Sequence, residues 1–403
     1  MTHDIAYLLH RFPENTDTFV KRELRWLMNA GTRVHVISVW KPNLLQTTSA
    51  NISEWSRHTS YLLPRSSARV AAAAVAIAVG SPGRFLSGVR LAWVTSRPGV
   101  HGVTYQLFYF LEAVLAAKEI QRRGYKHLHN HNGDQSGTVA MLAAKLAGIS
   151  YSITFHGWPV FFDAEYSHIR EKVNGAAFTR SISYFCRSQL MMFSSSRDQA
   201  PFKIVHCGVN VQEFKFRPPR KHVKRILCVA RMSPEKGLIF LIEAFKMLVD
   251  SGYKIQLRLV GSGVDQPLLM KMATDLKLDN EVSFLGHCPE AEVRRELENA
   301  DIFVLPSFVE GVPVSAMEAM AVGVPVIATN VGGTSELIQD GVSGILVRPS
   351  DAASICEAII RLIGDAGLRR KITKFGRQKI EDEFDADKEN AKLNGYLLET
   401  IKS

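Results

Sequence analysis

The chain has few cysteines, and their arrangement suggests neither a disulfide framework nor a zinc site. Five cysteines are scattered over 403 residues without a Cys-x-x-Cys pair. An odd, dispersed set argues against both kinds of cross-link. The first residues include Asp4 and no long apolar run, unlike a secretory signal. We therefore expect a cytoplasmic protein in a reducing compartment.

Acidic residues are missing from one long stretch of the first half. Residues 55–111 contain six arginines and no Asp or Glu. Their apolar run, residues 70–79, is too short for a membrane span, which needs about 20 residues. A basic, apolar segment can instead lie on an anionic membrane surface, which would place the protein peripherally on the inner face of the plasma membrane. The alternative is a buried alanine-rich helix with solvated arginines. Nucleic-acid binding is not expected, because the arginines accompany no nucleic-acid motif.

Short β-branched runs alternate with amphipathic stretches along the chain, which is typical of parallel α/β domains. Two prolines and a basic cluster at residues 216–222 indicate a linker. We predict two Rossmann-like, doubly wound domains facing a cleft, residues 1–216 and 217–384, and a C-terminal helix, residues 385–403, returning to the first domain. The predicted strands are residues 5–9, 34–39, 127–129, 151–154, 182–184, 203–205, 225–230, 255–260, 282–284, 302–305 and 325–327.

Two glutamates bracket the most informative loop of the second half. A loop with Glu310, Gly311 and Pro313 leads from a strand into a helix expected to begin at Ser315, with Glu318 in its first turn. A helix N-terminus after a parallel strand favours an anion such as pyrophosphate. Ser315 and Glu318 also fit a capping box, but capping would explain neither Glu310 nor the Gly-x-Pro loop.

Two cations and two glycines follow the first strands of the second domain. Arg231 and Lys236 suit a phosphate-binding pair, since arginine offers forked donors and lysine a compact charge. A solvated basic loop is the alternative. Gly261 and Gly263 form part of a dinucleotide fingerprint that lacks its third glycine, which Gln266 replaces. They allow close backbone approach by a ligand, although a tight turn explains them equally well.

Histidines gather in the first domain. His156 and Gly157 follow a predicted strand, which places an imidazole at the ligand edge of the sheet, although a lone histidine is usually structural. His127, His129 and His131 alternate along another strand and so face one side. Metal binding is conceivable there, but no acidic or cysteine partner is near in sequence, and we predict no metal.

Together these motifs resemble the family 4 glycosyltransferases of the two-domain glycosyltransferase-B fold. The family's E-x7-E motif is similar to Glu310 with Glu318, its basic pair to Arg231 with Lys236, and its His-Gly element to His156 with Gly157. The resemblance spans nearly the whole chain and is best in the C-terminal half.

The first loop, residues 11–19, lacks the glycine pair of many family members. Its F-P-x-x-[ST]-x-T-F pattern is similar to that of a subgroup linked to exopolysaccharide and colanic-acid-type synthesis. Donor contacts from this loop are therefore not assigned.

The resemblance implies a retaining, metal-independent glycosyltransferase without a cofactor, which moves a sugar from a UDP- or GDP-sugar to a glycan or lipid-linked acceptor in cell-surface or exopolysaccharide synthesis. Arg231 and Lys236 would neutralise the donor diphosphate, and His156 would lie near the reacting sugar. Glu310 would bind the sugar hydroxyls and Glu318 the ribose. The remaining expected donor contacts are Gly311, Val312, Pro313, Val314, Gly261 and Gly263.

Other functions stay open at this point. A nucleotide-sugar epimerase of the same fold would turn over the donor without an acceptor, and a glycan phosphorylase would need a further phosphate or cofactor site. An NAD-dependent oxidoreductase would bind nicotinamide cofactor, although the fingerprint is incomplete. A non-catalytic membrane-associated assembly factor would use residues 55–111 and turn over no donor.

Overall fold

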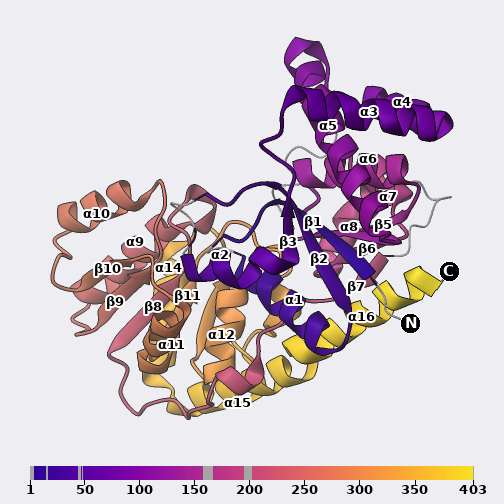
Figure 1. Ribbon diagram of the computed structural model, residues 1–403. Coiled ribbons are helices and arrows are strands. Elements are labelled where there is room, and N and C mark those ends of the chain that lie inside the picture. The colour runs from indigo at the N-terminus through magenta and orange to yellow at the C-terminus, as the bar shows by residue number, and fades with distance from the viewer. Residues whose placement is uncertain are drawn as a thin grey trace. The chain divides into compact units, whose positions relative to one another are not determined.

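The computed structural model describes residues 4–14, 17–43, 47, 49–157, 167–194 and 202–402. The chain forms two compact units (Figure 1): Met1–Val205 with Asn390–Ser403, and His206–Glu389. Each unit is built on its own parallel sheet with helical connections, so the predicted α/β class with two doubly wound domains is confirmed.

The first unit contains a seven-stranded sheet in the order β3-β2-β1-β4-β5-β6-β7, with every pair parallel. Its helices connect the strands on both sides of the order reversal between β1 and β4. The strands are β1 (Asp4–Arg11), β2 (Arg33–Trp40), β3 (Thr59–Tyr61), β4 (His127–Asn130), β5 (Ser150–Phe155), β6 (Phe178–Ser181) and β7 (Phe202–Ile204). The helices are α1 (Thr18–Asn29), α2 (Ser49–Trp55), α3 (Ser67–Gly80), α4 (Pro82–Val94), α5 (Gly99–Arg123), α6 (Gln135–Ala147), α7 (Ile169–Gly175) and α8 (Tyr184–Phe193).

The last helix, α16 (Ala386–Lys402), contributes to the core of the first unit. Leu393 and Leu397 are fully buried there in one cluster with Leu24 and Leu27 of α1. Burying a leucine side chain contributes roughly 1.5–3 kcal/mol. The hydrophobic stripe of α16 therefore fixes its C-terminal part to this unit.

Residues 67–111 of the acid-free stretch form α3, α4 and the start of α5, and most of their surface is exposed. Only Ala73 and Ile77 are buried in α3, and only Gly88 and Ala92 in α4. The alternative of a buried alanine-rich helix is therefore wrong, because α3 packs a narrow stripe and leaves its other faces in solvent. In Figure 1 these helices lie at the upper end of the first unit, away from its sheet.

The second unit contains a six-stranded parallel sheet in the order β10-β9-β8-β11-β12-β13. The strands are β8 (Arg225–Val229), β9 (Gln256–Val260), β10 (Val282–Gly286), β11 (Ile302–Leu305), β12 (Val326–Thr329) and β13 (Ile345–Val347). The helices are α9 (Leu238–Asp250), α10 (Gln266–Asp275), α11 (Glu290–Asn299), α12 (Val314–Val322), α13 (Thr334–Leu337), α14 (Ala352–Gly364) and α15 (Ala366–Glu383).

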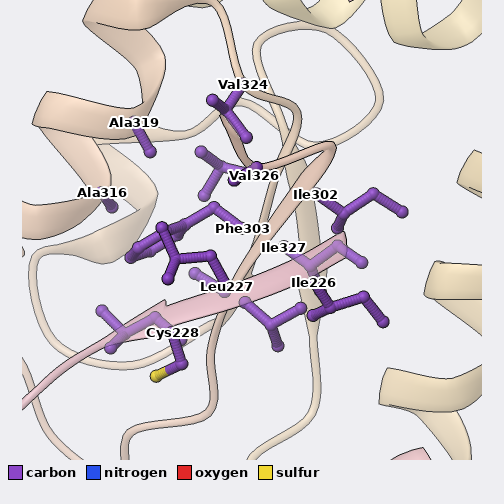
Figure 2. Close-up of a cluster of buried hydrophobic side chains, with 14 of the residues drawn as sticks. Ile226, Leu227, Cys228, Ile302, Phe303, Ala316, Ala319, Val324, Val326 and Ile327 are labelled. Carbon is purple, nitrogen blue, oxygen red and sulfur yellow. The ribbon is translucent and has the colours of Figure 1, made fainter. Parts of the chain in front are cut away.

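The core of the second unit explains why its strands read as continuous apolar runs. β11 and β12 are buried along their whole length, as expected for central strands covered by helices on both faces. Figure 2 shows Phe303 and Val326 on the side of the small residues Ala316 and Ala319 of α12. Small residues on this helix let it lie close to the sheet, which fixes the position of its N-terminus.

The boundary between the two units lies before residue 206 and not at the predicted linker, residues 216–222. Residues 206–222 pack on the second unit instead. The Val209 N–H donates to Phe384 O and the Ala386 N–H to Val209 O. The Arg217 N–H donates to Val322 O. The basic, proline-containing segment is therefore anchored along this unit by backbone hydrogen bonds.

One predicted strand is wrong and two strands were missed. Residues 182–184 do not form a strand, because Ser183 is the N-cap of α8 and accepts a hydrogen bond from the Cys186 N–H. The strand lies earlier in the chain, at β6. The missed strands, β3 and β13, are three-residue strands at the edges of their sheets, too short for an alternating pattern to show.

Candidate active site

The carboxyl ends of β8 and β11 meet where the strand order of the second sheet reverses. β8 connects onward to β9 on one side, whereas β11 connects to β12 on the other. Ligands of doubly wound sheets bind at such a point, outside the carboxyl ends of the strands. The loops that follow these two strands are joined by a backbone hydrogen bond of 2.8 Å from the Phe308 N–H to Glu235 O. The point of strand-order reversal, the switch point, therefore lies at the two loops predicted to bind the donor. These are the loop of Arg231 and Lys236 and the loop of Glu310.

Lys236 and Glu310 form the centre of this site. The Lys236 ammonium lies 2.6 Å from Glu310 Oε1, and the Ser307 hydroxyl donates to the same oxygen at 2.6 Å. The side chains of Lys236 and Glu310 are only 18% and 11% exposed. The structure therefore brings together one predicted cation and one predicted carboxylate from loops 74 residues apart.

The Glu310 loop is also fixed from the side of β12. The Gly333 N–H donates to Glu310 O at 3.1 Å, and the Thr329 hydroxyl donates to Ser307 O. A Cβ on Gly333 would lie 1.8 Å from Gly311 O, closer than any side chain can approach. Only glycine allows this contact, so the loop has little freedom to move.

Helix α12 presents an open N-terminus beside this loop. Its first residue is Val314 and its N-cap is Pro313, which makes no side-chain cap. The first N–H groups of a helix lack partners within the helix and carry the positive end of its dipole. The capping-box alternative is therefore wrong: Ser315 lies inside the helix, and half-buried Glu318 is its fifth residue rather than part of the first turn.

Among the predicted backbone contacts, Pro313 can give no amide hydrogen bond, because proline has no N–H. Val312 is buried, whereas Gly311 and Val314 are half-buried at the edge of the site. The N–H groups of Gly311, Val312 and Val314 can still form an anion-binding turn, which has one N–H donor fewer than predicted.

The Arg231 guanidinium is not part of the Lys236–Glu310 pair. Its side chain is 69% exposed and lies 3.7 Å from Glu235 Oε1. Burial acts to raise the pKa of Glu235, but the hydrogen bond from Ser233 and the charges of Arg231 and Lys236 lower it below its usual value. Glu235 therefore stays ionised and holds the exposed guanidinium near the loop.

Gly261 and Gly263 pack against the loop that follows β8. A Cβ on Gly261 would lie 2.0 Å from Ala230 O, and one on Gly263 would lie 2.1 Å from Met232 O. The Met232 N–H also donates to Ser262 O at 3.0 Å. In this structure the two glycines allow two loops to touch, and a direct ligand contact stays a prediction.

His156 follows β5 at the carboxyl edge of the first sheet and is half-buried. Its Nε2 lies 2.6 Å from Nδ1 of His131, which follows the neighbouring strand β4. His131 Nε2 in turn lies 3.1 Å from a carboxylate oxygen of Glu23 on α1. Burial is the main cause that lowers the pKa of His156 well below its usual value, so the ring is neutral near pH 7.

The three alternating histidines do not converge on one point as metal ligands would. His127 contacts the Ser150 and Ser152 hydroxyls, and His129 contacts the Ser152 and Thr154 hydroxyls. Burial lowers the pKa of His127 to about 3. Over the described part of the chain, no group of three or more His, Cys, Asp or Glu side chains could hold a metal ion.

Comparison with known proteins agrees with this geometry. Residues 210–379 match the family model "Glycosyl transferases group 1". The chain is 28% identical over 405 residues to the amylovoran biosynthesis glycosyltransferase AmsK of Erwinia amylovora, covering 94% of this chain and 95% of that relative. It is 25% identical to the putative colanic acid biosynthesis glycosyltransferase WcaL of Escherichia coli, covering 98% of this chain and 99% of that relative.

The chain therefore resembles the group 1 glycosyltransferases along almost its whole length. The resemblance seen in its motifs is thereby confirmed. Solved structures agree on the fold: Anabaena HepE, crystallised with UDP and glucose, is 18% identical with a TM-score of 0.73, covering 98% of this chain and 100% of that one. Sucrose-phosphate synthase of Thermosynechococcus elongatus is 19% identical with a TM-score of 0.75, covering 99% of each chain.

The motifs did not reveal the partners that hold the predicted site residues in place. Ser307, Thr329 and Gly333 fix the Glu310 loop, His131 contacts His156, and Glu23 contacts His131. One signal for Glu23 was present in the sequence: it falls on the same face of α1 as the buried residues Val20, Leu24 and Leu27. A charged residue on a buried helical face requires a partner.

We expect the Lys236–Glu310 pair to stabilise the transferase in the absence of any ligand. Lys236→Met or Glu310→Gln leaves a nearly buried charged group without its partner, so each should lower the free energy of unfolding by about 1–3 kcal/mol. Because the two groups interact directly, the double variant should lose less than the sum of the singles, measured by urea unfolding.

The matched control is Lys246→Met with Asp250→Asn, an ion pair one turn apart on α9 whose side chains are 32% and 59% exposed. A pair on the surface should couple by no more than about 0.5 kcal/mol. If the Lys236–Glu310 pair couples no more strongly than the control pair, its interaction contributes nothing to the free energy of unfolding.

Proposed function

We propose that this glycosyltransferase moves a sugar from a nucleotide diphosphate sugar, UDP- or GDP-linked, to a glycan or lipid-linked acceptor in exopolysaccharide or cell-surface synthesis. It does so with retention of anomeric configuration and without a metal ion. The support comes from the second-unit switch point, where an open helix N-terminus adjoins the loop of the Lys236–Glu310 pair. The names of AmsK and WcaL support the biosynthetic setting, and HepE, crystallised with UDP and glucose, supports a nucleotide-sugar donor.

The positive N-terminus of α12 is the observation that carries the proposal. It follows a parallel strand at the switch point, has no side-chain cap, and has no acidic residue in its first turn. Such an end binds phosphate groups by its free N–H groups and its dipole, which contributes about 0.3–1 kcal/mol and up to ~2 kcal/mol when partly buried. The donor diphosphate is the anion that this end would hold.

The two cations would act at different stages. Arg231, exposed beside Glu235, can approach a diphosphate without breaking a buried contact. Lys236 is already partly buried, so its charge is fixed in place before the reaction begins. Preorganised charge aimed at the leaving group stabilises the transition state more than the ground state. These cations, with the helix dipole, would supply the neutralisation that a metal ion would otherwise give.

The carboxylates would position the donor rather than act on its anomeric carbon. Glu310 is engaged by Lys236 and Ser307 through Oε1, which leaves Oε2 as the oxygen better placed to accept from sugar hydroxyls. Glu318 would accept from the ribose. A glycosidase pair would instead need one acid and one nucleophile at the scissile bond, whereas Glu310 already contacts the Lys236 ammonium.

The reaction itself forms one bond and breaks one. The acceptor hydroxyl oxygen bonds to the anomeric carbon on the face from which the nucleotide departs, and the bond from that carbon to the diphosphate oxygen breaks. The acceptor proton goes to the departing diphosphate oxygen. Positive charge develops on the sugar during this step, and the neutral His156 imidazole would lie near it without adding a like charge.

The catalytic proposal predicts nucleotide release that depends on the switch-point pair. With a panel of UDP- and GDP-sugars, chelator and an envelope lipid extract as the acceptor source, wild-type protein should release nucleotide from one donor. Lys236→Ala and Glu310→Ala should each lower that rate about 100-fold or more, because charge stabilisation of the leaving group is lost. Proton NMR of the product should show the anomeric configuration of the donor.

Lys246→Ala, which removes an exposed lysine of α9, is the matched control and should keep the wild-type rate. Absence of release and of donor binding at millimolar concentrations would contradict sugar transfer. Release that requires a divalent cation would refute metal independence alone, and an inverted product would refute retention alone.

We further propose that the exposed surface of α3, α4 and the start of α5 binds an anionic membrane at the inner face of the plasma membrane. Large apolar side chains are exposed there, including Leu86 at 67%, Trp93 at 74% and Val100 at 83%. Exposed arginines, among them Arg69 and Arg90, lie on the same helices. Apolar side chains and cations on a segment that has no Asp or Glu of its own match the chemistry of an anionic lipid surface.

The length of these helices fits a surface position. No single helix in the described ranges is long and apolar enough to cross a bilayer; α3 and α4 reach that length and composition only as a pair, with a bend of 120° between them. A lipid-linked acceptor would be presented at such a surface, which connects this proposal to the acceptor class.

We expect Arg69→Glu with Arg90→Glu to reduce co-sedimentation with phosphatidylglycerol vesicles about tenfold or more at low salt, since each basic residue near the surface contributes about 1 kcal/mol. Binding of wild-type protein should weaken as salt is raised. The matched control is Arg361→Glu with Arg370→Glu, which reverses two exposed charges in the second unit. Equal binding of wild type and the Arg69–Arg90 variant, or none, would refute the membrane surface.

A further inference from the structure

A row of buried polar side chains lies behind His156 in the first unit. It runs from His156 to His131 and from His131 to Glu23, with N···N and N···O distances of 2.6 and 3.1 Å. Glu23 and His131 are 3% and 1% exposed. Five elements far apart in the sequence contribute to it or anchor it: β1, α1, and the neighbouring strands β4 and β5 with β6 beyond them.

The carboxylate of Glu23 is neutralised at its own end of the row. The Arg180 guanidinium on β6 donates to Glu23 Oε2, and the Tyr7 hydroxyl on β1 donates to Oε1 at 2.9 Å. Burial acts to raise the pKa of Glu23, but the charges of His131 and Arg180 lower it well below its usual value. Glu23 is therefore ionised, and the buried ion pair with Arg180 already balances its charge.

An ionised carboxylate can only accept hydrogen bonds, so His131 must carry a proton on Nε2. The second hydrogen bond joins His131 Nδ1 and His156 Nε2, and one of these two nitrogens must donate it. The row therefore determines which nitrogen of the neutral His156 ring carries the proton.

The ring geometry supports a directed hydrogen bond rather than a stacking contact. The planes of His131 and His156 differ by 10°, and their centroids lie 4.7 Å apart. That separation is close to the N···N distance plus the two ring radii, so the rings lie edge to edge with the bond near their common plane. Phe19, one turn before Glu23 on α1, packs on both rings with centroid distances of 5.4 and 4.9 Å.

We propose that Glu23 and His131 are positioning residues for sugar transfer, which orient His156 and hold it in a single tautomer. This inference rests on the proposed function, because it assigns His156 to the reacting sugar. Partners of this kind hold an imidazole in one tautomer, and their loss commonly costs 10–100-fold in activity.

The first test is a kinetic double-variant cycle. His131→Phe removes the ring nitrogens but leaves the Glu23–Arg180 pair intact, so buried charge stays balanced. It should lower kcat about 10- to 100-fold with the donor KM within about threefold. In a His156→Ala background the same change should have almost no further effect, since His131 acts only through His156.

His127→Phe is the matched control: His127 lies on the same strand and is buried, but its ring nitrogens contact serine hydroxyls outside the row. It should keep kcat near the wild-type value. If His131→Phe lowers kcat equally with and without His156, its effect is structural and the proposal is overturned. Wild-type protein without nucleotide release from any donor would instead refute the proposed function itself.

A second measurement is made on the wild-type protein. Long-range proton–nitrogen NMR spectra of protein labelled with ¹⁵N-histidine report which nitrogen of each ring is protonated. The His156 signals, identified by their absence in His156→Gln, should show a neutral ring with its proton on one nitrogen only at neutral pH. A mixture of the two tautomers, or an imidazolium, would overturn the proposal even if the kinetic variants did not fold.

Discussion

The meeting of two loops at the reversal of strand order in the second sheet determines most of this site. Parallel pairing of β8 with β11 brings Lys236 against Glu310 across 74 residues of sequence. The loop of Glu310 is then held by Ser307 and by the backbone of Gly333, at a distance that excludes any side chain. The open N-terminus of α12 follows directly from that loop, so its position is as constrained as theirs.

In the first unit, buried hydrogen bonds and an ion pair fix the position of the His156 side chain. This unit buries a charged pair, Glu23 with Arg180, and links it to His156 through His131. A buried ion pair usually adds little net stability, because desolvation offsets much of the attraction. Orientation of His156 would be a functional reason to keep such a pair in a core that hydrophobic residues could fill.

The sequence predicted the parts of this molecule whose signal is local. β11 was placed at its observed bounds, and the two motif loops lie at the predicted strand ends. Contacts between distant segments gave no local pattern, which is why Glu23 was not connected with His131, 108 residues away. The capping pattern at Ser315 misled because three-residue spacing also occurs inside a helix, and only the backbone shows that α12 begins at Val314.

Calorimetric titration of the protein with UDP and with GDP, in the presence of chelator, tests the central claim most directly. The open α12 terminus and Lys236 should bind one of these nucleotides without a divalent cation, and Lys236→Ala should weaken that affinity about tenfold or more. Absence of binding by either nucleotide at millimolar concentrations, or equal affinity in Lys236→Ala, would contradict the assignment of this switch point as the donor site.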